Sequence, residues 1–189
     1  MNKLASALLL AALGAAEITI DPSTKMFRDD EGRARIFHGQ NVVVKLPPYL
    51  PTTDKFDPFT SMVDEDFQNM QNWGVKIVRL GVMWEAVEKS PGVYDHDYLN
   101  TVESMIKKFG DYGIYTLVDN HQDMFSRKLC GEGVPHFYTP KELDDHCPLT
   151  PLGIAFQLAG QCVALRSYHF EEDADGLPLI SECQKHDFF

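Results

Sequence analysis

The chain has 189 residues and carries 28 acidic against 17 basic side chains, for a formal net charge of −11. This acidic balance argues against a nucleic-acid backbone or an anionic membrane surface as the main partner. The length is enough to bury a core, but a complete (β/α)8 barrel takes about 250 residues.

The first 16 residues have the pattern of a secretory signal peptide. Lys3 precedes the apolar run Leu4–Leu13, and the small residues 14–16 follow that run. The run is too short for a membrane-spanning helix, which needs about 20 apolar residues. We therefore expect cleavage after Ala16, no integral membrane segment, and a secreted or lysosomal, lumenal location for residues 17–189.

All the cysteines lie in the second half of the chain. In an oxidising compartment an even count predicts two disulfides, and the spacing leaves all three pairings open. The sequence contains no Cys-x-x-Cys and no His-Glu-x-x-His motif, so we expect neither a metal nor a cofactor. The cysteines are Cys130, Cys147, Cys162 and Cys183.

The N-terminal part of the mature chain has the pattern of β structure. Residues alternate from Met26 to Ile36 around an acidic, glycine-ending turn at 29–32, which predicts a β-hairpin. The β-branched run 36–44 predicts a strand buried on both faces. The proline-rich residues 46–51 predict a loop.

Two helical patterns alternate with two further strands. A helix is expected from the N-cap Asp64 to Gly74, and a second helix from residue 97 to 109. Apolar residues 75–80 and 114–119 predict the strands. The first helix is expected to bury Phe67, Met70 and Trp73.

This alternation predicts the fold class. Strand, helix, strand, helix, strand is typical of parallel βα units. We expect an α/β fold, specifically a partial (β/α)8 TIM barrel with roughly the first three βα units preceded by the β-hairpin.

Polar side chains follow these strands where a barrel keeps its active site. Lys45 follows the first strand, and His121 and Asp123 follow the third. Asp123 could orient the imidazole of His121 so that it binds a sugar hydroxyl. Alternatively, His121 could be only a structural histidine at the strand end with its hydrogen bonds satisfied. Arg79 lies within an apolar run and needs a carboxylate partner, either in a structural salt bridge or in the site.

Three segments carry a resemblance to a known family. Residues 38–49, 78–88 and 114–125 resemble the first three strands of endoglycoceramidases in glycoside hydrolase family 5, and residues 130–135 continue the match. The resemblance implies a retaining glycosidase that cleaves the oligosaccharide–ceramide bond of glycosphingolipids, with peripheral contact to lipid. It implies that Lys45, His121 and Asp123 bind the sugar and that Arg79 supports the catalytic nucleophile.

A retaining mechanism needs two carboxyl groups about 5–5.5 Å apart. In the family these are glutamates, one after an asparagine that follows the fourth strand and one at the end of the seventh. The sequence contains no Asn-Glu dipeptide and reaches Phe189 before a fourth strand is evident. We therefore expect a truncated N-terminal part of the barrel, without catalytic residues and inactive alone. The remaining acidic candidates are interpreted as loop or sugar-binding residues: Glu85, Glu88, Asp119, Asp123 and Glu132.

Two other functions remain open. One is a family 5 β-glucanase or cellulase-like hydrolase of soluble polysaccharide. The other is a non-catalytic isoform that binds glycan or lipid.

Overall fold

A computed structural model describes residues 18–139 and 170–185 of the chain. The predicted signal peptide lies outside these residues. The chain divides into two compact units, Met1–Phe37 and His38–Phe189.

The first unit contains a small antiparallel sheet in the order β1-β2-β3. Its strands are Thr19–Ile20, Phe27–Arg28 and Ala34–Arg35. The predicted hairpin is confirmed: Phe27 pairs with Arg35 across a turn in which Gly32 has φ 75°. That backbone conformation favours glycine, because a Cβ atom strains it.

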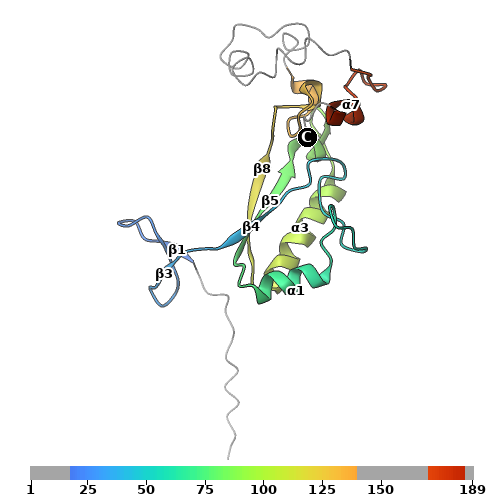
Figure 1. Ribbon diagram of the computed structural model, residues 1–189. Helices are drawn as coiled ribbons and strands as arrows, with labels where there is room; N and C mark the ends of the chain where they lie inside the picture. The colour runs from blue at the N-terminus through green and yellow to red at the C-terminus, as the bar shows by residue number, and fades with distance from the viewer. Residues whose placement is uncertain (1–17, 140–169, 186–189) are drawn as a thin grey trace, which may run out of the picture. The chain divides into compact units, whose positions relative to one another are not determined.

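The second unit is built on a parallel sheet in the order β4-β5-β8 (Figure 1). β4 spans Gly39–Val42, β5 spans Ile77–Met83 and β8 spans Tyr115–His121. The predicted alternation of strands and helices is therefore confirmed. β8 continues past the expected end at residue 119, so that Asn120 and His121 also lie within the strand.

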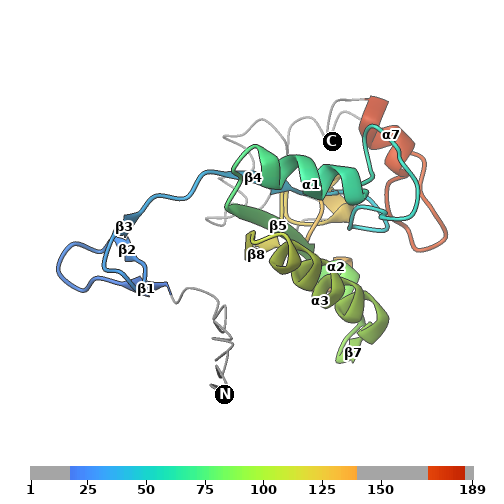
Figure 2. The same ribbon diagram turned by 90° about the horizontal axis from the view of Figure 1, so that it is seen from below.

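Two helices, α1 (Asp64–Asn72) and α3 (His96–Asp111), pack on the same face of this sheet (Figure 2). Asp95 precedes α3 and caps its N-terminus: the Asp95 side chain accepts a hydrogen bond from the backbone N–H of Tyr98, a common way to cap a helix. Side chains from both helices and from β5 fill one continuous core, which includes Phe67, Met70, Val78, Leu80, Val102, Met105 and Phe109.

The expected burial of Trp73 is wrong. The helix α1 ends at Asn72, and Trp73 is 70% exposed. Gly74 follows with φ 76° and turns the chain away from the helix axis. Trp73 lies in that terminal turn, where the helical spacing that places Phe67 and Met70 in the core no longer holds.

The expected burial of the first strand on both faces is also wrong. Gly39, Gln40 and Asn41 of β4 are exposed. On β8, Leu117 is 55% exposed. Among the described residues, β4 and β8 are the two edges of a three-stranded sheet. The helices α1 and α3 cover one face of this sheet and leave the opposite face exposed.

The connection from β5 to α3 holds elements that the pattern did not predict. A short helix α2 (Trp84–Val87) leads into a two-stranded ribbon of β6 (Glu88–Ser90) and β7 (Val93–Tyr94). The buried carboxylate of Glu88 organises this turn, because it accepts hydrogen bonds from Trp84 Nε1 at 2.6 Å and Gly92 N at 2.7 Å.

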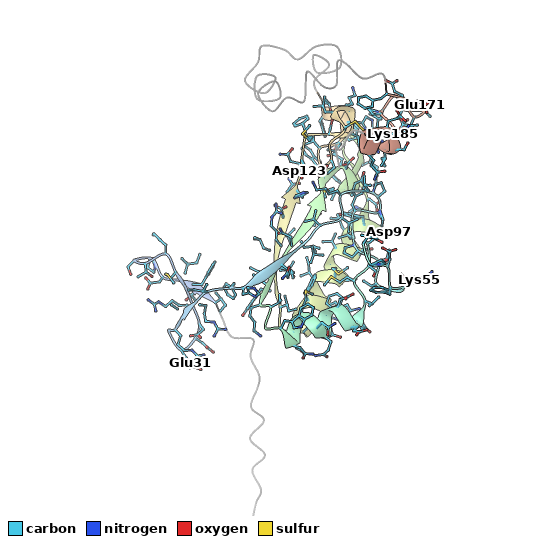
Figure 3. The ribbon with its side chains drawn as sticks, in the orientation of Figure 1. Glu31, Lys55, Asp97, Asp123, Glu171 and Lys185 are labelled. Atoms are coloured by element: carbon cyan, nitrogen blue, oxygen red, sulfur yellow. A yellow bond between two sulfur atoms is a disulfide. The ribbon has the colours of Figure 1, made fainter. Side chains whose placement is uncertain are left out.

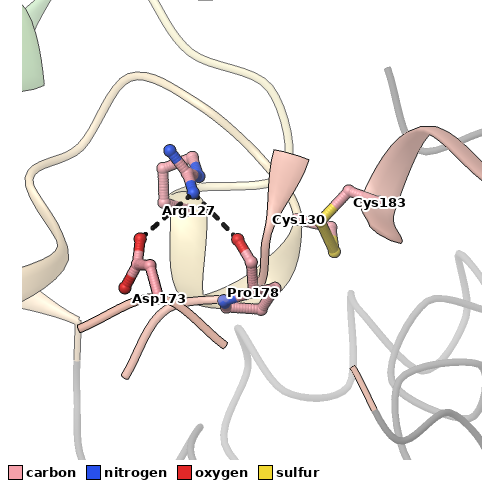
Figure 4. The surroundings of a disulfide bond; sticks show 5 residues. All are labelled: Arg127, Cys130, Asp173, Pro178 and Cys183. Atoms are coloured by element: carbon pink, nitrogen blue, oxygen red, sulfur yellow. Dashed lines mark hydrogen bonds and ion pairs between the residues drawn. A yellow bond between two sulfur atoms is a disulfide. The ribbon is translucent and has the colours of Figure 1, made fainter. Parts of the chain in front are cut away.

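After β8 the chain forms two 3-10 turns, η1 (Arg127–Leu129) and η2 (His136–Tyr138), and later the helix α7 (Ile180–Lys185). A disulfide joins Cys130 to Cys183 and so holds α7 against η1 (Figure 4). Arg127 Nη2 donates to the Pro178 carbonyl oxygen at 2.8 Å beside it. The other two cysteines, Cys147 and Cys162, lie outside the described residues.

Candidate functional site

Polar side chains gather at the carboxyl ends of the three parallel strands. The register of the sheet places Gly81 of β5 beside Asp119 and Met83 beside His121 of β8. Lys45 follows β4, and Asp123 follows β8, at the end of the sheet shown at the top of Figure 3. The predicted residues Lys45, His121 and Asp123 are therefore brought together.

The Lys45 ammonium lies between two carboxylates. It donates a short hydrogen bond to Asp123 and lies 3.3 Å from Glu132 Oε1. Burial lowers the pKa of Lys45, but the two acids outweigh that effect and hold it above its ordinary value. The same hydrogen bond from Lys45 lowers the pKa of Asp123. At neutral pH this pair is therefore fully charged.

His121 is buried and has contacts on both ring nitrogens. Its Nδ1 lies 2.9 Å from Asp119 Oδ2, so a proton on Nδ1 donates to that carboxylate. Its Nε2 lies 3.4 Å from Asp123 Oδ2 and 3.9 Å from Glu132 Oε1, and it makes no hydrogen bond. Asp119 thus orients the imidazole, and Nε2 is left facing the Lys45 cluster.

Arg79 has the carboxylate partner that its place in an apolar strand required. Its Nη2 lies 2.6 Å from Asp119 Oδ2 and 3.3 Å from His121 Nδ1. Asp119 therefore connects Arg79 of β5 to His121 of β8. This accounts for Arg79 as a salt bridge between strands. Its support of a nucleophile stays a prediction.

Glu132, one of the acidic residues interpreted from the sequence as a loop or sugar-binding residue, belongs to the same cluster. Its side chain is 1% exposed. Its backbone forms an antiparallel bridge with Asp123: Asp123 N donates to Glu132 O at 3.1 Å, and Glu132 N donates to Asp123 O at 2.9 Å. The glycines on both sides of Glu132 are the sequence signal that marks this loop.

These glycines are needed for close approach. A Cβ atom on Gly131 would lie 2.4 Å from the Asp123 carbonyl oxygen, and one on Gly133 would lie 2.3 Å from Gln122 Cβ. Gly133 also has φ 115°. The loop that follows β8 can therefore fold back on the end of that strand, and it places the Glu132 carboxyl beside the Lys45 ammonium.

Burial raises the pKa of Glu132 to about 7, although Lys45 opposes that shift. Asp123 raises it further, because two carboxylates close together disfavour the second negative charge. The loss of water around the side chain is thus the larger effect. Glu132 is half-protonated close to neutral pH.

A second buried carboxyl supports this loop from the other side. The backbone N–H of Gly133 donates to Glu85 Oε1 at 2.8 Å, and Glu85 N donates to the Gly133 carbonyl at 2.8 Å. Burial raises the pKa of Glu85 and that of Tyr49, which hydrogen-bonds to Glu85. These groups anchor the loop and do not reach Lys45 among the contacts of the described residues.

Three side chains of the cluster have the composition of a metal site. Ligand atoms of His121, Asp123 and Glu132 all lie within 4.8 Å of one another. The Lys45 ammonium already lies against both acids. A metal ion would have to displace this cation, so the donor set does not fit a resident metal as the side chains stand.

Within residues 18–139 and 170–185, the structure has no helix long and apolar enough to cross a membrane.

Residues 50–145, half of the chain, match the cellulase family, glycosyl hydrolase family 5. An endoglycoceramidase of Hydra vulgaris is 41% identical over 62% of this chain and 23% of its own length. One of Cyanea nozakii is 36% identical over 83% of this chain and 33% of its own length. The chain thus spans about a third or less of the length of these relatives.

A comparison with solved structures also finds an endoglycoceramidase. Endo-glycoceramidase II from a Rhodococcus species, in complex with ganglioside GM3, superposes on 66% of this chain and 28% of its own chain. The TM-score is 0.51 and the sequence identity is 27%. The expected partial TIM barrel is confirmed, with no closed barrel among the described residues. By its sequence match and its three parallel strands with connecting helices, the chain belongs to glycosyl hydrolase family 5.

Proposed function

We propose that the chain is the sugar-binding N-terminal part of a retaining glycosidase that cleaves the oligosaccharide–ceramide bond of glycosphingolipids. The observation that carries the proposal is the convergence of Lys45, His121 and Asp123 at the carboxyl ends of the parallel strands. The endoglycoceramidase relatives and the ganglioside complex of the Rhodococcus enzyme support this substrate class.

In this proposal the three side chains bind hydroxyl groups of the sugar beside the scissile bond. Lys45 has an N–H donor beyond those directed at the two acids, Asp123 is half-exposed, and His121 Nε2 has no hydrogen bond. A ring hydroxyl both donates and accepts, so it can satisfy the imidazole and the carboxylate together. Arg79 is assigned the supporting role beside the nucleophile.

We assign no described residue the role of nucleophile or acid/base. The carboxyls of the cluster are committed to Lys45, Arg79 and His121, and a proton donor for a leaving group needs a carboxyl free to face the substrate. A ceramide substrate also implies peripheral contact with lipid, and the N-terminal pattern of Lys3 and Leu4–Leu13 supports a secreted or lumenal location.

Calorimetric titration of the chain with the trisaccharide headgroup of GM3 tests the sugar-binding role. We expect binding in the millimolar range, weakened about tenfold by Lys45→Met, which removes the charged donor. The matched control is the exposed Lys55→Met, which should bind as the wild type does. Absence of heat at millimolar ligand would contradict the proposal.

Cellotriose in the same titration separates the alternatives. Tighter binding of cellotriose than of the ganglioside headgroup would favour a β-glucanase acting on soluble polysaccharide. A fluorescent glycosphingolipid tests catalysis: we expect no oligosaccharide to be released by this chain. Binding without hydrolysis also fits the non-catalytic isoform, and release of oligosaccharide would overturn the assignment of no catalytic residue.

A further inference from the structure

Glu132 is the most deeply buried member of the site cluster and has no role in the sugar-binding set described above. Its Oε1 accepts no hydrogen bond, although Lys45 Nζ lies 3.3 Å away and His121 Nε2 lies 3.9 Å away. A buried carboxyl without full hydrogen bonding costs free energy. The chain nevertheless holds it there with two glycines and a backbone bridge to Asp123.

We propose that Glu132 is a positioning residue for Lys45, which its buried carboxylate and that of Asp123 hold between them at the sugar-binding surface. The inference rests on the proposed sugar-binding function of Lys45. Because Glu132 is almost inaccessible, it acts on a ligand through Lys45 and does not touch it.

The Lys45 ammonium is held by two carboxylates that approach it from different segments of the chain. Asp123 contacts Lys45 from the end of β8 and is 48% exposed, whereas Glu132 contacts it from the loop after β8 and is 1% exposed. Asp123 alone would leave a long, flexible lysine free to turn toward water. The second carboxylate removes that freedom, and it does so without occupying the exposed surface where a sugar would bind.

The attraction between Glu132 and the Lys45 ammonium depends on the charge of Glu132. The groups that face it are Lys45 after β4, His121 and Asp123 at the end of β8, and no other ionisable side chain among its described contacts. With a pKa of about 7, it changes from mostly protonated at pH 6 to mostly ionised at pH 8. The protonated form attracts the ammonium far less.

The ligand-binding experiment compares the wild type with Glu132→Gln, which keeps the shape and removes the charge. For the wild type we expect the affinity for the GM3 trisaccharide to be at least about threefold higher at pH 8 than at pH 6. Glu132→Gln should bind with the lower affinity at both pH values. Glu132→Asp, which retains a carboxylate, should keep the pH step.

Glu85→Gln is the matched control, because Glu85 is also a buried carboxyl that holds this loop but does not contact Lys45. It should bind with the wild-type pH step. The step is judged by the difference between the wild type and Glu132→Gln. A step that persists in Glu132→Gln would overturn the proposal.

A measurement without ligand keeps this test separate from the proposed function. We expect the ¹³C resonance of the Lys45 ε-carbon to shift with the same midpoint as the carboxyl carbon of Glu132, and this shift should be absent in Glu132→Gln. If no variant binds the trisaccharide but Lys45 follows Glu132, the sugar-binding function fails and the positioning stands. If Lys45 does not follow Glu132, the positioning is wrong.

Discussion

At the scale of single residues, the site combines charges whose surroundings differ sharply. Asp123 and Glu132 both contact Lys45, but Asp123 is half-exposed and Glu132 is fully buried. Their pKa values accordingly move in opposite directions, Asp123 below its ordinary value and Glu132 to about 7. The hydrogen bond from Lys45 lowers the pKa of Asp123, whereas burial is the larger effect on Glu132 and raises its pKa.

Glu132 should make folding stability depend on pH. Its pKa is 4.5 without perturbation and about 7 in the folded chain. Between these values the folded state holds a proton that the unfolded state has released, so the free energy of unfolding falls as pH rises through this window. It levels off above pH 7. The expected loss is about 3 kcal/mol.

Urea unfolding of the wild type and Glu132→Gln at pH 5 and pH 8 measures this effect. The variant lacks the titrating carboxyl. Between pH 5 and pH 8 its free energy of unfolding should therefore fall by about 3 kcal/mol less than that of the wild type. Glu65→Gln, at an exposed position of α1, is the control and should reproduce the wild-type difference. Equal pH dependence in the wild type and Glu132→Gln would contradict the prediction.

The Arg79–Asp119 pair should contribute modestly to stability, since Arg79 is 39% exposed and water screens the interaction. We expect Arg79→Met and Asp119→Asn each to destabilise the chain, and the double variant to lose less than the sum. The coupling should be about 1 kcal/mol. A double-mutant cycle by urea unfolding measures it, and strict additivity would show that the contact contributes nothing.

At the scale of elements, the loop that follows β8 depends on backbone more than on side chains. The bridge between Asp123 and Glu132 brings two acidic residues, nine positions apart in the chain, to the same ammonium. It can form only because Gly131 and Gly133 allow the backbone to approach residues 122–124. The parallel strands, by contrast, are specified by ordinary apolar patterns.

Gly133→Ala should destabilise the chain by about 2 kcal/mol or more, because the new methyl group meets Gln122 Cβ and the backbone has positive φ. Gly110→Ala is the matched control. Gly110 lies in α3 with nothing within 4 Å of an added Cβ, so alanine should stabilise the helix by about 0.5–1 kcal/mol. Thermal unfolding compares the two, and a neutral Gly133→Ala would show that the loop can relax.

At the scale of the whole molecule, the described part of the second unit has a sheet with one face covered by helices and one exposed face. The helices α1 and α3 bury the core side of the sheet, and the other side exposes Leu117 and most of β4. Far along the chain, the disulfide between Cys130 and Cys183 ties α7 to the site loop.

Removing the disulfide should therefore be costly. The double variant Cys130→Ser/Cys183→Ser frees a loop with a sequence separation of 53 residues, and the entropy that its unfolded chain regains corresponds to about 4 kcal/mol. Urea unfolding should show a lower midpoint. An unchanged midpoint would mean that η1 and α7 unfold apart from the core whether or not they are linked.

Much of the fold could be predicted from local patterns. The helices α1 and α3 and the strands β5 and β8 follow apolar periods, and the proline run 46–51 is a loop as expected. The short α2 and the β6–β7 ribbon escaped prediction because they depend on single contacts such as those of Glu88. Trp73 was misplaced because periodicity continues past the point at which a helix ends.

The sequence by itself determined the family, the order of βα units and the set Lys45, Arg79, His121 and Asp123, because parallel strands necessarily bring their carboxyl ends to one edge. Tertiary structure alone decided that Cys130 pairs with Cys183, that Asp119 links Arg79 to His121, and that Glu132 lies buried under Lys45. These contacts join residues distant in the chain, and burial is what changes their charge. No local sequence pattern encodes these long-range contacts or the burial that accompanies them.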